Sequence, residues 1–113
     1  MSPQDTEVTV RELVARCEQE CRKMLSTPTP GARSFHLKRM REIVVVLQRR
    51  EKQVNAATRL IGVKLGRAQD DSSLQRAWDN SALYRAYVQR ARHRCEAMRD
   101  RSAKAAPNFI DSL

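Results

Sequence analysis

The stretch Ser34–Gln69 constrains the fold more than any other part of the chain. It contains no proline, and it holds the only run of five adjacent aliphatic residues, Ile43–Leu47. Its apolar residues recur mainly at spacings of three and four, which is typical of one side of an α-helix. A valine-rich run also suits a β-strand, but no other segment alternates as a pairing strand would. The sequence therefore predicts a long central helix.

A helix start signal precedes a shorter apolar stripe near the N-terminus. Thr9 and Glu12 have the spacing of a capping box, and Val8 and Leu13 occupy the positions of a hydrophobic staple. We expect a first helix over residues 9–26. Its apolar side comprises Val10, Leu13, Val14, Cys17, Cys21, Met24 and Leu25.

The segment Ser26–Gly31 separates the first helix from the central one. Its two prolines push the residues before them out of helical geometry, so we expect a connector here. Ser34 is then the expected N-cap of the central helix. Further along, we expect Gly62 to allow close packing and Gly66 to end the helix. The central helix is therefore predicted over residues 34–66.

The most regular apolar pattern of the chain lies in its C-terminal third, where the spacings of three and four are typical of coiled-coil packing. Ser72 and Gln75 have capping-box spacing, and Pro107 is a stop signal. We expect a third helix over residues 72–106 and a flexible tail over residues 107–113. The apolar positions of this helix are Leu74, Ala77, Ser81, Tyr84, Val88, Ala91, Cys95, Met98, Ser102 and Ala105.

These elements predict an all-α fold, an antiparallel three-helix bundle with a long central helix, in a single domain over residues 1–113. The first helix is only about half as long as the central one, so part of the apolar stripe should stay uncovered, around 54–65 or around 88–98. We expect this surface to bind a protein partner or a second copy of the chain. The residues assigned to it are Val54, Ile61, Leu65, Tyr84, Val88 and Met98.

The net charge of +9 is concentrated in the central helix. Ser34–Gln69 carries nine lysines and arginines against two glutamates, whereas residues 1–33 have no net charge. A localised basic surface favours an acidic partner or nucleic acid, and the alternative is a solvated face. Aromatic side chains for base stacking are scarce, so nucleic-acid binding is the second hypothesis. The basic stripe assigned to an acidic partner is Arg49, Arg50, Lys52 and Arg59.

The cysteines and histidines show no strong metal-ligand spacing. Cys17 and Cys21 form a single Cys-x3-Cys pair, and Cys95, His36 and His93 are isolated. All three cysteines lie on apolar stripes, so we favour core thiols over a disulfide or a metal site. The sequence also lacks a Gly-rich phosphate loop and a Ser/His/Asp grouping. We therefore expect a non-enzymatic protein without cofactor or metal.

The sequence contains no apolar run of about 18 residues, so we expect no membrane span. The N-terminal segment has no apolar signal-peptide core, and its acidic residues disfavour a mitochondrial presequence. An odd number of cysteines fits a reducing compartment. We expect a cytoplasmic protein, with the nucleus as the alternative.

The segment Ser81–Arg92 contains the tripeptide Leu83-Tyr84-Arg85. It resembles the start of the small mitochondrial proteins that are named for their Leu-Tyr-Arg tripeptide. The resemblance implies a basic three-helix adaptor that binds acyl carrier protein and serves iron–sulfur and respiratory-complex assembly. In that family the tripeptide opens the first helix, whereas here it lies in the predicted third helix. This is the third hypothesis, after a helical interaction module or adaptor and a nucleic-acid-binding protein.

Overall fold

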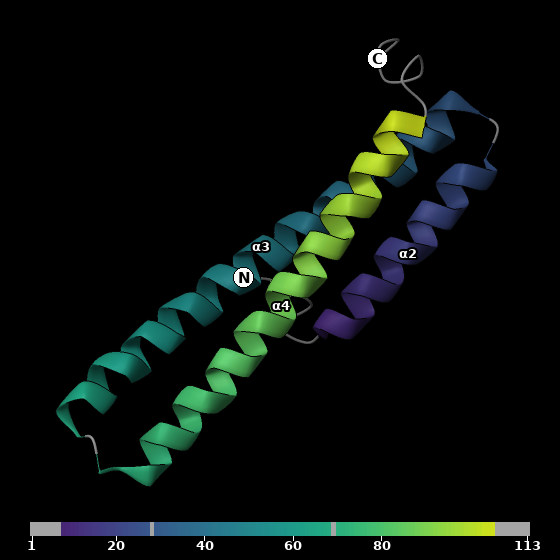
Figure 1. Ribbon diagram of the computed structural model, residues 1–113. Helices are drawn as coiled ribbons and strands as arrows, with labels where there is room; N and C mark the ends of the chain where they lie inside the picture. The colour runs from purple at the N-terminus through teal and green to yellow at the C-terminus, as the bar shows by residue number, and fades with distance from the viewer. Residues whose placement is uncertain (1–7, 28, 69, 106–113) are drawn as a thin grey trace.

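Three α-helices form the part of the chain that the structure, a computed structural model, describes: residues 8–27, 29–68 and 70–105 (Figure 1). They are α2 (Val10–Ser26), α3 (Pro30–Arg67) and α4 (Ser72–Ala105). α3 and α4 form a long hairpin, and α2 packs beside the start of α3 and the end of α4. The predicted all-α three-helix bundle with a long central helix is therefore confirmed. The predicted tail lies outside the described residues.

The predicted start of the first helix is confirmed. The side-chain oxygen of Thr9 accepts a hydrogen bond from the backbone N–H of Glu12 at 3.1 Å. This bond satisfies one of the N–H groups that the first turn of a helix leaves unpaired. The apolar side of α2 then packs against the hairpin through Val10, Leu13, Cys17 and Met24, which are all buried.

The central helix begins about one turn earlier than predicted, at Pro30 instead of Ser34. Thr29 has an extended backbone and precedes the helix, and its carbonyl accepts a hydrogen bond from the N–H of Arg33 at 3.1 Å. Proline is favoured in the first turn because its missing N–H would have no partner there. The predicted connector is therefore shorter than the sequence indicated, and Ser34 lies inside α3.

The turn between α3 and α4 also differs from the prediction. Gly66 does not end the central helix, because it lies inside α3 without a left-handed backbone. α4 is capped by Asp71 rather than by Ser72, since the Asp71 carboxylate accepts hydrogen bonds from the backbone N–H groups of Ser73 and Leu74. A carboxylate at this position also interacts favourably with the positive end of the helix dipole.

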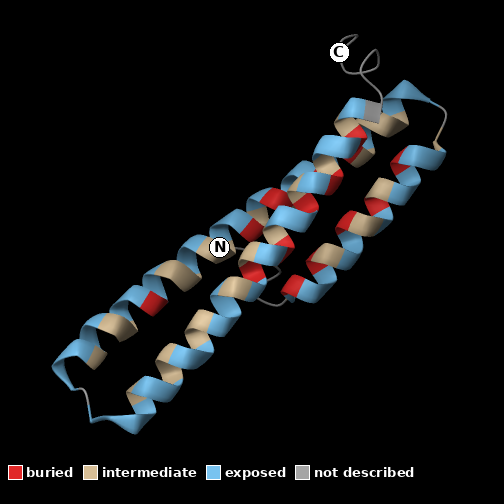
Figure 2. Cartoon of the chain, in the orientation of Figure 1, coloured by how far each residue is buried: buried red, intermediate tan, exposed pale blue. Residues whose placement is uncertain are grey.

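The core lies in the half of the molecule that α2 covers (Figure 2). In the half of the described hairpin that α2 does not cover, Thr58 is the one buried residue. Its hydroxyl contacts the hydroxyl of Ser81 and so joins the two helices. The buried apolar residues are Val10, Leu13, Cys17, Met24, Leu37, Met40, Val44, Leu47, Val88, Ala91, Cys95 and Met98.

The prediction of core thiols is confirmed for Cys17 and Cys95, which are fully buried. Cys21 is half-buried, and its sulfur lies 3.4 Å from the hydroxyl oxygen of Ser102. A hydrogen bond toward Cys95 and burial both raise the pKa of the Cys17 thiol, so it stays protonated. All three thiols are free. Within the described ranges, no three His, Cys, Asp or Glu side chains form a group that could hold a metal ion.

The indole of Trp78 in α4 packs directly against Gly62 of α3. A Cβ atom at this position would lie 2.7 Å from Cζ3 of Trp78, a distance at which the indole would have to move. A Cβ atom at Gly66 would have nothing within 4 Å. Close packing at Gly62 is therefore confirmed, but an aromatic side chain of α4 packs there in place of the expected backbone.

Replacing each glycine with alanine should change stability in opposite directions. Gly66→Ala should stabilise the protein by up to about 1 kcal/mol, because alanine is the better helix former. Gly62→Ala should destabilise it by roughly 1–3 kcal/mol, because the gain in propensity is outweighed by overpacking against Trp78. Urea unfolding followed by circular dichroism measures both values. Equal stability of the two variants would contradict the close packing.

Candidate interaction surface

The candidate site is the side of the α3–α4 hairpin that α2 leaves uncovered. α2 has 17 residues, whereas α3 and α4 have 38 and 34. At about 1.5 Å per residue, α2 covers about 26 Å of a central helix that is about 57 Å long. Among the residues that the structure describes, one half of the hairpin therefore has no third helix beside it (Figures 1 and 2).

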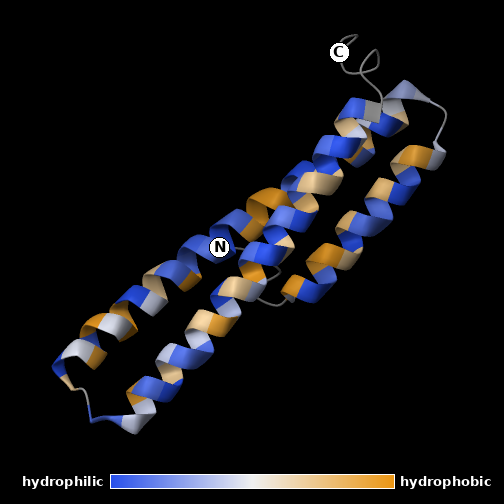
Figure 3. Cartoon of the chain, viewed as in Figure 1, coloured by the Kyte–Doolittle hydropathy of each residue, from blue (hydrophilic) through white to orange (hydrophobic). Residues whose placement is uncertain are grey.

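α3 carries one apolar row through both halves of the molecule. Leu47 belongs to the core, and Val54 and Ile61 follow it at seven-residue steps, which are close to two helical turns. Val54, Ile61 and the neighbouring Leu65 are half-buried. Hydrophobic residues thus continue along α3 beyond the part that α2 covers (Figure 3).

α4 has a matching row. Met98 and Ala91 are buried in the core, and seven-residue steps toward the start of α4 lead to Tyr84 and Ala77. Tyr84 is 43% exposed, and Ala77 is half-buried. We define the open face as Val54, Ile61 and Leu65 of α3 together with Ala77 and Tyr84 of α4.

Most of the partner-binding stripe predicted from the sequence lies on the open face, but two of its residues do not. Val88 and Met98 are 0% and 5% exposed. Their assignment to a free surface was wrong, because α2 packs over the second half of α4. Ala77, in turn, was missing from the predicted stripe. Ala77 is one of the regularly spaced apolar positions of α4, so the sequence identified it as apolar. The spacing does not show which half of α4 is covered by another helix.

The predicted basic stripe does not lie on one side of α3. Lys52 and Arg59 are exposed and share one side of the helix because they are seven residues apart, and Arg49 is exposed next to this side. Arg50 is half-buried and donates a hydrogen bond to the backbone carbonyl of Val8. Arg50 therefore belongs to the contact between α3 and the start of α2.

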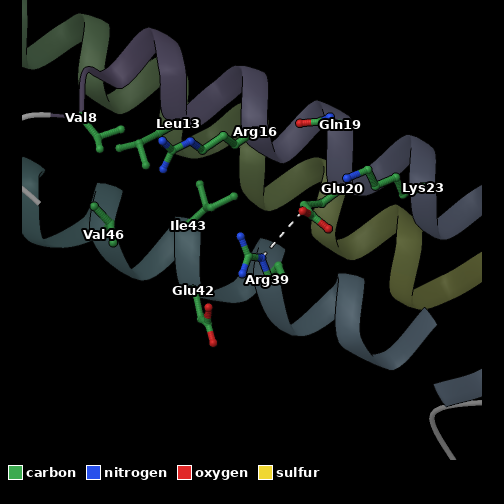
Figure 4. Close-up of a pocket in the computed structure, with 10 residues that line it drawn as sticks. All are labelled: Val8, Leu13, Arg16, Gln19, Glu20, Lys23, Arg39, Glu42, Ile43 and Val46. Carbon is green, nitrogen blue, oxygen red and sulfur yellow. Dashed lines mark ion pairs between the residues drawn. The ribbon is translucent and has the colours of Figure 1, made fainter. Parts of the chain in front are cut away.

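A hollow of about 380 Å³ lies between α2 and α3 (Figure 4). On its wall, Glu20 forms a hydrogen bond with Nδ1 of His36 at 2.6 Å and an ion pair with Nε of Arg39 at 3.7 Å. His36 is thus a partner of a buried carboxylate. The sequence, by contrast, had indicated an isolated histidine. These contacts satisfy Glu20 within the helix interface, whereas Arg16, Lys23 and Glu42 line the hollow and form no ion pair with a described residue. Its apolar lining is Val8, Leu13, Ile43 and Val46.

The Leu83-Tyr84-Arg85 tripeptide lies inside α4, with all three residues exposed. Leu83 is 71% exposed. Only Tyr84 belongs to the open face.

Comparison with known proteins gives no match. No family model fits the chain, and no curated protein or solved structure is significantly similar to it. No helix within the described ranges is long and apolar enough to cross a membrane.

Substitutions in the two halves of α4 should lower the free energy of unfolding by different amounts. Met98→Ala should destabilise the protein by roughly 2–5 kcal/mol, because it removes buried atoms and leaves a cavity. Tyr84→Ala should cost well under 1.5 kcal/mol, because this side chain is already exposed to water. Chemical unfolding of both variants at the same protein concentration measures the difference. Similar losses would show that the open face is covered in solution.

Proposed function

We propose that this protein is a helical protein–protein interaction module, a small subunit or adaptor whose open face receives a helix of a protein partner. One observation carries the proposal: the apolar rows of α3 and α4 continue along the whole described hairpin, and α2 covers only half of them. In the covered half, α2 buries Ala91 and Met98. In the uncovered half, the same rows continue as Val54, Ile61 and Tyr84, and a second helix laid there would complete the bundle.

Covering the open face with a helix would gain enough free energy for binding. Apolar surface removed from water contributes roughly 25 cal/mol per Å². A helix that covers several hundred Å² on the open face therefore gains several kcal/mol, which is partly offset by the cost of association. Apolar residues at helical spacing are the usual anchors of this mode of recognition. The free thiols support the reducing cytoplasm as the place where the module works.

A synthetic amphipathic helix with leucine at its core positions and uncharged polar residues elsewhere is a suitable probe. Ile61→Asp should weaken its binding at least about tenfold, a loss of about 1.4 kcal/mol, because the variant buries a carboxylate. Val63→Asp is the matched control, since Val63 is 50% exposed and lies two residues away on α3. Fluorescence anisotropy measures both affinities, and circular dichroism verifies the fold. No binding by the unaltered protein, or equal losses in both variants, would contradict the proposal.

Nucleic-acid binding is the second candidate function, and the outer side of α3 favours it. Lys38, Lys52 and Arg59 are exposed and recur at multiples of seven residues, so they form one cationic row. If this row contacts phosphates, binding to a single-stranded RNA should fall by orders of magnitude between about 50 and 200 mM salt. The double substitution Lys52→Glu/Arg59→Glu should then abolish binding in a filter-binding assay. Unchanged binding by this variant would remove the row from consideration.

A further inference from the structure

We infer that the helix received by the open face belongs to an acidic partner: an amphipathic helix with Asp and Glu on both flanks of its apolar side. This inference rests on the proposed function and adds the chemistry of the partner. Basic side chains border the open face on α3 and on α4, and a basic hollow lies at the end where α2 begins.

The border on α3 follows from the contacts of α2. Ile43 lines the hollow between α2 and α3, and seven residues later Arg50 donates a hydrogen bond to the carbonyl of Val8. Two further steps of seven residues lead along the same side to Ala57 and Lys64. Lys64 is exposed, and no acidic side chain within the described ranges forms an ion pair with it.

The border on α4 continues from the contacts that α4 makes with α2. Arg94 forms an ion pair with Glu18 of α2, and Arg90 lines the hollow that these two helices enclose. Steps of seven residues from Arg90 toward the start of α4 lead to Leu83 and Arg76. Arg76 and Arg90 are both exposed. The second flank of the open face is therefore also cationic.

A hollow of about 380 Å³ marks the point where α2 begins and the open face starts. Arg11 and Arg90 bring two guanidinium groups to it, and neither forms an ion pair with a described acidic residue. Val14 and Tyr87 supply apolar surface beside them. A glutamate suits this site, because its methylene groups contact the apolar side chains while arginine binds its carboxylate.

Four acidic residues lie between Arg50 and Arg90 in the sequence, and three of them, Asp70, Asp71 and Asp79, line one hollow with Arg76. Glu51 forms an ion pair with Arg92 between α3 and α4, and the hydrogen bond between them raises the pKa of the Arg92 guanidinium. Asp71 caps α4 in the turn that follows α3, where Asp70 also lies. Asp79 accepts a hydrogen bond from the glutamine side chain one turn before it in α4. Lys64 and Arg90 thus have no acidic partner among the described residues of this half of the hairpin, whereas the carboxylates around Arg76 offset part of its charge.

The charges also argue against a second copy of the chain as the occupant. Each copy carries a net charge of +9, and pairing two open faces would place Lys64, Arg76 and Arg90 of both copies at one interface. Like charges brought together across an interface are unfavourable. α2 shows the favourable arrangement, since its Glu18 pairs with α4 and its Glu20 pairs with α3. A helix with acids on both flanks repeats this arrangement on the open face.

Two synthetic amphipathic helices with identical leucines test the inference, one with glutamate at the flanking positions and one with lysine. The glutamate peptide should bind the full chain at least about tenfold more tightly at low salt, and the difference should shrink as salt is added. The triple variant Lys64→Glu/Arg76→Glu/Arg90→Glu should reverse this preference. The matched control Lys38→Glu/Arg41→Glu/Lys52→Glu changes the net charge equally on exposed positions of α3, and it should keep the preference.

The outcomes separate the inference from the function on which it rests. Equal affinity for both peptides, with both lost in Ile61→Asp, overturns the acidic partner and retains the helix-binding face. Binding of neither peptide contradicts the proposed function itself. Reversal by the control variant overturns the inference, because the attraction is then general. A dimer in sedimentation equilibrium that Ile61→Asp dissociates identifies a second copy as the occupant and also overturns it.

Discussion

The packing of α2 against one half of the hairpin is the contact on which the rest of the structure depends. Apolar side chains of all three helices meet there, among them Leu13, Leu47 and Met98, and they form the core of the described chain. Isolated helices are marginal in water, and most helical stability comes from burying an apolar side. The uncovered half of the hairpin has fewer such contacts, so it is held largely by continuity with the covered half.

Local contacts allow that uncovered half to extend as a pair of helices. Gly62 lets the indole of Trp78 pack against α3, and the hydroxyl groups of Thr58 and Ser81 meet between the helices. These contacts lie between α3 and α4, and Gly62 and Trp78 line one hollow with Leu65 of the open face. The hairpin can therefore keep its shape while Ile61 and Tyr84 stay accessible to a partner.

Charge distinguishes the two halves of the hairpin. In the covered half, acidic residues of α2 face basic residues of both neighbours, and Glu20 is buried between His36 and Arg39. Beyond the start of α2 the basic residues continue, but a helix with matching acids is absent from the described part of the chain. Part of the excess positive charge of the sequence therefore lies on the borders of the open face, and part lies on the exposed row of Lys38, Lys52 and Arg59.

The sequence by itself determined the helices, their apolar rows, the Thr9 cap and the close approach at Gly62, because these depend on local periodicity and residue size. Only the tertiary structure decided which rows are covered. α2 ends beside the start of α3, so in an antiparallel bundle it lies along the first half of α3 and the second half of α4. That placement buries Val88 and Met98 and leaves Val54, Ile61 and Tyr84 accessible. Helical spacing is identical in both halves, so the pattern alone cannot distinguish a covered row from an open one.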